Sequence, residues 1–398
     1  AGDDTAADED AAAATAADPA TGERSVSGPT PDISPYLALG VGAAAPGLMA
    51  TQHTWAAAEE VGGLAATPCQ PGREQTWLIG GGAGPERAER LLISNPGANP
   101  ITVDVTVYST AGVSSPPAGQ GLSVPPQGRV VLLGDALAPG ADAPAFHIAA
   151  SGGDALVVLA ETELDGTLPV GFDLVSAAAP PSLSVVVPGV AAPEVDQGTL
   201  LLRVVNPGEI DAIGTVSALT ADGERPIPEA VVRVPAQSAV DVEIEGLDPG
   251  VTSLLVTADS EISAAARTVR VSGAGVGGVD AGWAVGRSAP DELAGAALLP
   301  VDGVSQTLVL SAATTEATVA VTTVSGTEVE RRDVVVPAAG SVTQVLDADA
   351  VWVRPAAGGE VVGAVVVASG EDGPAGHTVI PLREPQTIAR LSQVVPVG

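Results

Sequence analysis

Apolar and polar residues alternate along many short stretches of this chain. Between Ile101 and Tyr108, Ile or Val occupies every second position, and Thr, Asp or Tyr occupies the positions between. This two-residue period gives a β-strand one apolar face and one polar face. Glycine-containing dipeptides separate such stretches, at Ala111-Gly112, Asp165-Gly166, Asp222-Gly223, Ser325-Gly326 and Asp372-Gly373. Because glycine accepts the positive φ of tight turns, these dipeptides predict hairpins and mostly antiparallel strands.

A further pair of strands is predicted later in each third of the chain. The pairs are 146–150 with 155–162, 254–258 with 262–271, and 351–354 with 361–368. No long segment has the period of an amphipathic helix. The 48 Gly and 34 Pro also favour turns over helices. We therefore expect little helix.

The strand pattern belongs to an internal repeat. Asn95-Pro96-Gly97 returns as Asn206-Pro207-Gly208 about 110 residues later. In the same order, Gly112 returns as Gly223 and Gly326, and Val124-Pro125 returns as Val234-Pro235 and Val336-Pro337. A repeat of roughly 100 residues with some seven short strands is typical of a β-sandwich. The sequence predicts an all-β protein with three tandem immunoglobulin-like antiparallel β-sandwich domains.

The repeat also sets the expected domain boundaries. We predict β-sandwiches at residues 67–182, 183–292 and 293–398. Residues 36–66 are interpreted as a partial repeat or linker, because His53-Thr54-Trp55 resembles Ala281-Gly282-Trp283 near the end of the second repeat. Residues 1–35 are Ala-rich and acidic with few large apolar side chains, so we expect a disordered N-terminal segment.

Charge restricts the range of partners. The chain has 48 Asp and Glu against 16 basic residues, all of them Arg, and a formal net charge of −32. Phosphate binding along a nucleic acid needs a basic face, so nucleic acid is excluded as an expected partner. An anionic membrane surface is disfavoured for the same reason. This acidity is expected to keep the chain soluble and its sheet edges apart.

The expected location is outside the cytoplasm. The chain does not begin with Met and holds no apolar stretch long enough to span a bilayer. These features indicate that a signal peptide or an anchor has been removed, and that any membrane attachment uses a segment absent from this chain. Cys69 is the single cysteine, so it cannot form an internal disulfide.

Three acidic residues and two tryptophans are candidate binding residues. Glu161, Glu163 and Asp165 alternate along one predicted strand, and carboxylates on one face are ligands that Ca²⁺ prefers. The alternative is an ordinary solvated strand face. Trp55 and Trp77 are candidate stacking platforms for sugars, and the alternative is that each ring belongs to a core.

Catalytic chemistry has little support in the sequence. Gly80-Gly81-Gly82-Ala83-Gly84 follows an apolar stretch but lacks the residues of a phosphate-binding motif, so an inter-strand turn is predicted. His53, His147 and His377 lie in different parts of the repeat pattern, and no metalloprotease or nucleophile-elbow motif is present. We therefore predict no catalytic residues, no cofactor and no enzymatic activity.

Several motifs together resemble a known family. They are Trp77-Leu78-Ile79-Gly80-Gly81-Gly82, Leu92-Ile93-Ser94-Asn95-Pro96-Gly97, Val103-Asp104-Val105, Val124-Pro125-Pro126 and Pro188-Gly189-Val190. The chain resembles, from about residue 50 to its end, an uncharacterised family of actinobacterial cell-envelope proteins, one of the domain-of-unknown-function families. The resemblance implies an exported or membrane-anchored protein associated with envelope glycosylation, and it transfers no catalytic residue.

Two functions are compatible with these features. Repetition without catalytic motifs favours a non-enzymatic extracytoplasmic cell-envelope protein, a stiff array of sandwiches that acts as a scaffold or spacer for protein–protein contacts. The alternative is a carbohydrate-binding or polysaccharide-assembly accessory protein that uses Trp55 and Trp77. The expected partner is accordingly an envelope protein or polysaccharide.

Overall fold

The computed structural model describes residues 48–385 except 58–61, 83, 85, 272–277 and 370–374. The predicted disordered segment 1–35, part of the predicted partial repeat and the Asp372-Gly373 turn lie outside the described residues. Within them, the helical elements are a 3₁₀ turn, η2 (Pro117–Gly119), and α1 (Gly134–Leu137). Neither is long and apolar enough to cross a membrane. The prediction of an all-β protein with antiparallel sheets is confirmed.

Residues 75–175 form two antiparallel sheets. One has the strand order β11-β10-β4-β8, and the other has the order β3-β9-β5-β6, with β7 also paired to β5. The strands are β3 (Gln75–Ile79), β4 (Arg87–Ser94), β5 (Ile101–Ser109), β6 (Gly112–Ser114), β7 (Leu122–Val124), β8 (Arg129–Leu133), β9 (Ala145–Ser151), β10 (Leu156–Asp165) and β11 (Leu168–Val175). The alternation predicted for β5 is present, since Val103 and Val105 are buried while Asp104 between them is exposed.

Two further groups of antiparallel strands follow, the second in one sheet and the third in two. The second group contains β12 (Ser182–Ala192), β13 (Gly198–Asn206), β14 (Ala212–Thr220), β15 (Gly223–Val234), β16 (Ser238–Glu243), β17 (Gly250–Val271) and β18 (Val279–Val285). The third contains β19 (Ala294–Ala297), β20 (Val304–Ala312), β21 (Ala317–Ser325), β22 (Glu328–Val336), β23 (Gly340–Leu346), β24 (Ala350–Gly358), β25 (Val362–Ser369) and β26 (His377–Pro381). In the third group the two sheets are β19-β24-β21-β22 and β23-β20-β25-β26.

One predicted strand pair is wrong. Segments 254–258 and 262–271 form a single strand, β17, whose first half pairs with β12 and β14 and whose second half pairs with β13 and β18. The matching connections in the other groups contain Gly152-Gly153 and Gly358-Gly359, with φ of 86° at Gly152 and at Gly358. Residues 259–261 contain no glycine. The strand therefore continues across this corner and joins the two sheets into one.

The repeated Asn-Pro-Gly motif has a structural role. The Asn95 side-chain amide donates to the carbonyl of Asn99 at 2.8 Å and to that of Val124 at 3.2 Å. Asn206 donates in the same way to Ile210 at 2.7 Å and to Val234 at 3.1 Å. Each Asn closes the loop after its strand onto the segment that carries Val-Pro. The repeated Asn therefore has a structural role, in which it closes a loop by hydrogen bonds, and it is not a reactive group.

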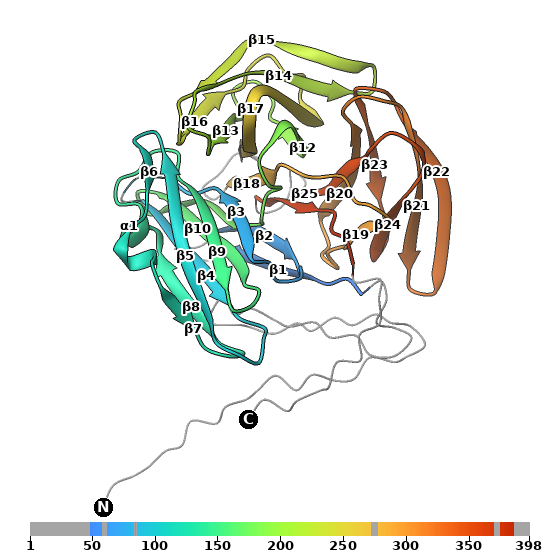
Figure 1. Ribbon diagram of the computed structural model, residues 1–398. Helices are drawn as coiled ribbons and strands as arrows, with labels where there is room; N and C mark the ends of the chain where they lie inside the picture. Colours follow the sequence, from blue (N-terminus) through green and yellow to red (C-terminus); the bar gives the residue numbers. More distant parts are fainter. Residues whose placement is uncertain are drawn as a thin grey trace, which may run out of the picture.

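Three lobes of antiparallel strands lie around a common centre (Figure 1). The edge strands β11, β18 and β26 meet there, together with β2 (Gly62–Pro68) of a hairpin formed with β1 (Thr51–Ala57). The apolar cores continue between lobes, because Trp283 of β18 belongs to the first core and Leu64 of β2 belongs to the third. The lobes are therefore grouped around shared central strands, and each lobe contacts the centre.

Candidate functional site

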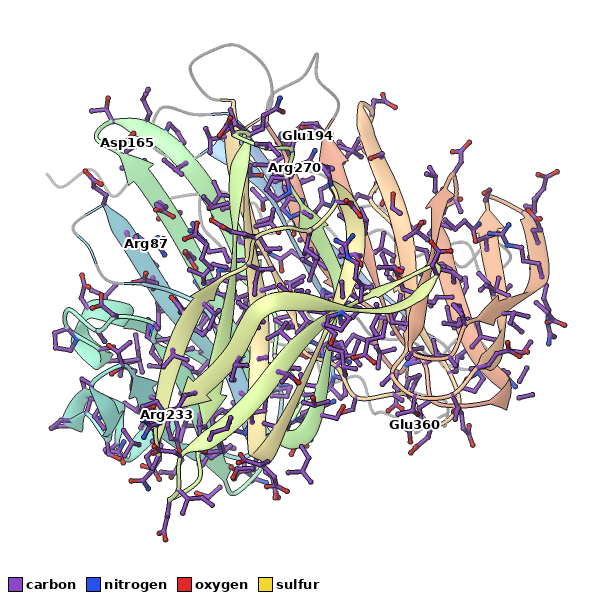
Figure 2. All side chains as sticks on the ribbon, turned by 90° about the horizontal axis from the view of Figure 1, so that it is seen from above. Arg87, Asp165, Glu194, Arg233, Arg270 and Glu360 are labelled. Atoms are coloured by element: carbon purple, nitrogen blue, oxygen red, sulfur yellow. The ribbon has the colours of Figure 1, made fainter. Side chains whose placement is uncertain are left out.

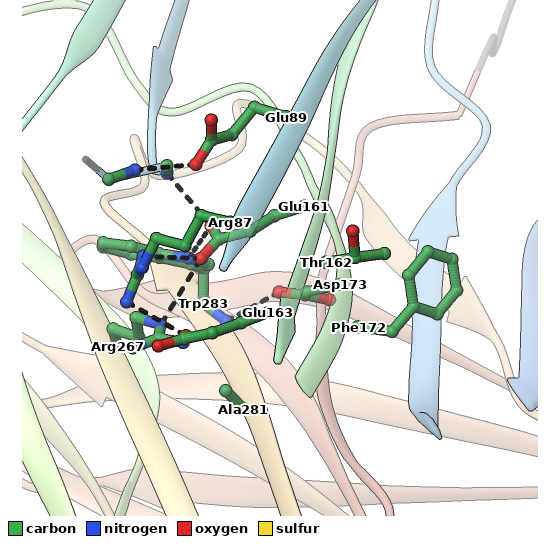
Figure 3. Close-up of polar contacts among 12 residues, drawn as sticks. Arg87, Glu89, Glu161, Thr162, Glu163, Phe172, Asp173, Arg267, Ala281 and Trp283 are labelled. Atoms are coloured by element: carbon green, nitrogen blue, oxygen red, sulfur yellow. Dashed lines mark hydrogen bonds and ion pairs between the residues drawn. The ribbon is translucent and has the colours of Figure 1, made fainter. Parts of the chain in front are cut away.

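Two glutamates of β10 lie against arginines at the inner side of the first lobe (Figure 3). Arg87 of β4 places one guanidinium nitrogen 3.0 Å from Glu161 Oε1 and the other 2.9 Å from Glu163 Oε2. Arg267 of β17, from the second lobe, pairs with Glu163 and lies 3.7 Å from Glu161. The two glutamates and two arginines form a compact network of balanced charge that joins two lobes.

This network disfavours the calcium hypothesis. The oxygens of Glu161 and Glu163 face arginines, and Asp165 is exposed at the outer end of the β10–β11 hairpin (Figure 2). Within the described residues, no group of three or more His, Cys, Asp or Glu side chains is placed to hold a metal ion. The three carboxylates alternate along a strand as predicted, but two of them, Glu161 and Glu163, are paired with arginines.

The glycine loop before β4 contributes its backbone to the same network. The Gly81 N–H donates to Glu161 Oε2 at 3.0 Å, and the Trp283 indole N–H donates to the same oxygen at 2.9 Å. Burial raises the pKa of Glu161, but Arg267, Arg87 and these two donors outweigh it and hold the pKa below its ordinary value. The loop donors that could bind a phosphate are therefore directed at a buried carboxylate.

Glu89 of β4 has a pKa shift in the opposite direction to that of Glu161. Its Oε1 accepts the Gly82 N–H at 3.0 Å. Burial raises the pKa of Glu89 to about 7, with repulsion from Glu161 adding to the rise and the Gly82 hydrogen bond and Arg87 opposing it. The fold therefore holds a carboxyl group that is neutral under mildly acidic conditions.

The substitution Glu89→Gln is expected to raise the free energy of unfolding by about 3 kcal/mol above neutral pH and by almost nothing near pH ~4. An unfolded glutamate loses its proton near its ordinary pKa of 4.5, whereas folded Glu89 keeps it to about 7. Wild-type stability therefore falls as the pH rises between these values, and glutamine is free of this loss while still accepting from Gly82. Urea denaturation across this range measures the difference. Glu328→Gln, at an exposed site, is the control, and a gain that did not change with pH would contradict the assignment.

Asp280 of β18 is the acceptor that joins most strands at the centre. Its Oδ2 accepts the backbone N–H of Leu64 on β2 at 2.8 Å and that of His377 on β26 at 2.7 Å. Its Oδ1 accepts the N–H of Ala281 at 2.8 Å and that of Phe172 on β11 at 3.4 Å. Burial raises the pKa of Asp280 well above its ordinary value despite these donors. One side chain thus connects four strands.

Asp173 of β11, like Asp280, accepts hydrogen bonds from several strands. Its Oδ2 accepts the Trp283 backbone N–H at 2.7 Å, and its Oδ1 accepts the Leu174 N–H at 2.9 Å and the Thr378 hydroxyl at 3.3 Å. Burial raises the pKa of Asp173 to about 7, while its hydrogen bonds from Trp283, Leu174 and Thr378 oppose the rise. The two aspartates therefore connect β2, β11, β18 and β26, which belong to different lobes.

Arg203 of β13 is a buried arginine with a full set of partners. Its Nε and Nη2 donate to the two oxygens of Asp241 at 2.7 and 2.8 Å. Its Nη1 donates to the carbonyls of Gly81 and Pro144 in the first lobe, both at 2.8 Å. The guanidinium carbon lies 5.0 Å from the centre of the Trp283 ring. This arginine joins the first and second lobes, and each nitrogen of its buried guanidinium has an acceptor.

The tryptophans proposed as sugar platforms lie in packed surroundings. Trp77 is 8% exposed and belongs to the first core, where its ring stacks on His147 at 4.5 Å and lies 5.4 Å from Tyr108. Trp55 on β1 is partly buried against the third core. The Trp77 ring has no open face for a sugar, so the structure supports the core interpretation of this residue.

The histidines do not converge. Burial lowers the pKa of His53 and of His147. His377 is 1% exposed, and within the part of the chain that the structure describes neither ring nitrogen has a hydrogen-bond partner. Burial followed by the charge of Arg270 lowers its pKa to about 3. A neutral enclosed imidazole of this kind packs as an apolar group.

A cleft with a volume of about 480 Å³ lies where the three lobes meet. Its wall combines the segment before β3, the link from β11 to β12, the link from β18 to β19, and the segment after β26. Three arginines line it: Arg73, Arg287 and Arg383. Asp154 and Glu384 line it as well, so the five charged groups carry a net positive charge.

The sequence predictions omitted the central aspartates and this cleft. Asp173 and Asp280 look like ordinary polar residues of alternating strands, because their partners lie far away in the chain. The signal for the cleft was available in the repeats. Arg287 and Arg383 occupy matching positions shortly after β18 and β26, and each forms an isolated antiparallel bridge with the first strand of its own group.

Residues 20–348 match the model of a family described as a family of unknown function, DUF5719. The chain belongs to this family. The DUF5719 match covers the first two groups of strands and the third through β23, and it confirms the prediction of an uncharacterised family. The family description names no activity and therefore assigns no catalytic residue in this DUF5719 chain.

No curated protein matches the chain. Among solved structures, the crystal structure of a GH78 family rhamnosidase from Bacillus sp. GL1 is similar at 9% sequence identity, over 73% of this chain and 54% of that chain, with a TM-score of 0.16. The DUF5719 chain thus spans about half the length of that rhamnosidase chain. A TM-score of this size carries no argument about fold or activity.

Proposed function

We propose that this protein is a non-enzymatic, extracytoplasmic cell-envelope protein in which three immunoglobulin-like β-sandwich units form one rigid scaffold for contacts with an envelope protein or polysaccharide. The observation that carries the proposal is the use of the buried polar groups. Asp173 and Asp280 accept hydrogen bonds from strands of different lobes. Groups used in this way fix the lobes relative to one another.

The surroundings of the titratable groups favour a scaffold over an enzyme. Glu161 and Glu163 are paired with Arg87 and Arg267, and His377 is enclosed. A general acid or base must reach a substrate proton. The central groups are buried under strands, where a substrate has no access.

The outer surface supports a partner other than nucleic acid. The net charge of −32 disfavours phosphate backbones. Single apolar side chains project from outer strands of the third lobe, including Val329 on β22 at 67% exposed and Val345 on β23 at 70% exposed. These positions suit reporters of a protein contact because changing them leaves the core intact.

Fractionation of cells that make the full-length protein tests the location. We expect the protein in the envelope fraction, and we expect protease added to cells with a permeable outer layer to degrade it while a cytoplasmic marker enzyme survives. A photo-crosslinking residue at Val329 is expected to yield defined adducts with envelope components, compared with the same residue at buried Val321. Recovery with the cytoplasmic marker would refute the proposal.

The absence of activity is tested with the purified chain and isolated envelope polysaccharide. We expect no increase in reducing ends and no release of soluble sugar, as for a heat-denatured sample of the same protein. Release above that of the heat-denatured sample would overturn the scaffold assignment, and its loss in Glu161→Gln or Asp173→Asn variants that are folded by circular dichroism would show that the central carboxylates are catalytic.

A further inference from the structure

The cleft at the meeting point of the lobes contains a buried guanidinium without enough acceptors. Arg383 is 5% exposed and donates from Nη2 to the carbonyl of Ala177 at 2.9 Å. Its Nε and Nη1 are buried and have no hydrogen-bond partner among the described residues. Since a buried charge without partners costs free energy, the contrast with fully bonded Arg203 requires an explanation.

A second arginine lies beside the first. Arg287 is half-buried and donates from Nη2 to the carbonyl of Leu382 at 3.2 Å. Burial, with the charge of Arg73 adding to it and that of Glu384 opposing it, lowers the pKa of Arg287 to about 10. Burial and then the charges of Arg287 and Arg73 lower the pKa of Arg383 well below its ordinary value. The three guanidinium groups therefore repel one another in a region that lacks sufficient negative charge.

The arginines are brought together by the architecture of the repeats. Isolated bridges pair Trp77 with Ala178, Val186 with Arg287, and Gly295 with Arg383. These three bridges follow β11, β18 and β26, so the second residue of each bridge occupies a corresponding place at the centre. Two of the three places hold arginine and the first holds alanine. Three of 16 arginines in a chain of net charge −32 thus line one cleft.

Apart from the charged groups, Gln70 and Ser288, the side chains that line the cleft are apolar. Prolines from four separate segments line the cleft, together with side chains of the third lobe; these residues are Pro71, Pro180, Pro290, Pro385, Leu310, Val353, Val361 and Leu382. Proline lacks an N–H, so the rim offers few competing donors. A volume of about 480 Å³ is in the range of small-molecule sites and exceeds what a bare inorganic anion fills.

We propose that this cleft binds a small amphipathic oxyanion, a phosphate or carboxylate group carried on an apolar body, through Arg287 and Arg383 with Arg73 at the rim. The oxyanion supplies the acceptors that Arg383 Nε and Nη1 lack, and the planar fork of a guanidinium matches the paired oxygens of either group. The apolar body lies against the prolines and aliphatic side chains. This inference goes beyond the proposed scaffold role and does not depend on it.

Isothermal titration calorimetry of the full chain with octyl phosphate, octanoate, inorganic phosphate and octyl glucoside tests the site. We expect one octyl phosphate or octanoate per chain, with affinity that falls as salt increases. The probe with the higher affinity identifies the oxyanion. Inorganic phosphate and neutral octyl glucoside are each expected to bind at least tenfold more weakly, because each lacks one half of the recognised chemistry.

Arg383→Gln and Arg287→Gln are each expected to weaken binding of the preferred anion at least tenfold. Arg73→Gln, at an exposed site, gives a smaller loss and leaves the fold intact. The matched control is Arg233→Gln, because Arg233 is an exposed arginine on β15 paired with Asp211, and it is expected to bind as the wild type does (Figure 2). Circular dichroism and thermal unfolding establish that each variant is folded.

Three results would overturn the proposal. One is that neither octyl phosphate nor octanoate binds the wild-type chain at millimolar concentration. Another is binding that folded Arg287→Gln, Arg383→Gln and Arg73→Gln all retain, which would place the anion elsewhere. The third is binding of inorganic phosphate or octyl glucoside as tight as that of the preferred probe, which would remove the amphipathic requirement. The fractionation result is unaffected by any of these outcomes.

Discussion

Replacement of Asp280 by alanine is expected to lower the free energy of unfolding by about 4 kcal/mol, because several buried donors lose their acceptor at once. The N–H groups of Leu64, Ala281 and His377 lie within 2.8 Å of this carboxylate. The side chain is 1% exposed, so bulk solvent does not reach these donors in the folded protein. Equilibrium unfolding in urea measures the loss.

The loss should be concentrated at the centre of the molecule. Hydrogen exchange is expected to accelerate most at β2 and β26, whose N–H groups donate to Asp280, and least at β22, an outer strand of the third lobe. The conservative variant Asp280→Asn keeps one acceptor oxygen, so it should lose about half as much stability and remain folded if the alanine variant does not.

Asp302→Ala is the matched control, because Asp302 is exposed, and a change within about 0.5 kcal/mol is expected there. The central role of this carboxylate would be refuted if Asp280→Ala unfolded with the same urea midpoint as the wild type. It would also be refuted if hydrogen exchange accelerated equally in all strands. The scaffold proposal would then lose the observation on which it rests.

Local patterns predicted the strands well because their causes are local. Alternation placed β5 correctly, and the turn glycines Gly112, Gly223 and Gly326 have the positive φ that hairpins require, at 103°, 108° and 55°. The wrong prediction near residue 260 has the same origin. Two apolar runs separated by three polar residues read as two strands, but without a glycine the backbone had no reason to turn.

The relative placement of the lobes could not be predicted from such patterns. It depends on contacts between residues far apart in the chain, such as Asp280 with Leu64, which no alternation or spacing encodes. The candidate sites show the same limit. Glu161 and Glu163 were correctly placed on one strand face, but the partner that decides their role, Arg267, comes from another lobe. Alignment of the repeats would have brought Arg287 and Arg383 together, since their bridges correspond.

Replacement of Glu161 by glutamine is expected to destabilise the protein by about 4 kcal/mol, as is usual when one partner of a buried ion pair is removed. Glu163 alone would then face Arg87 and Arg267. Its own loss should cost less, because the side chain of Glu163 is 20% exposed and that of Glu161 is 4% exposed. Glu163→Gln is therefore the matched comparison in the same network.

The pH dependence of this loss separates an ion pair from a simple packing defect. Because the folded pKa of Glu161 is lowered, its contribution is complete above the ordinary pKa of 4.5 and is lost as the pH falls through the folded value. The difference in free energy of unfolding between wild type and Glu161→Gln should therefore shrink in acid.

Millimolar Ca²⁺ should leave the wild-type melting temperature unchanged, because Arg87 and Arg267 already neutralise the carboxylates that a calcium ion would need. A calcium-dependent rise in melting temperature that Glu161→Gln abolished would show instead that Ca²⁺ displaces the arginines from these carboxylates, and that the network is a metal-binding site.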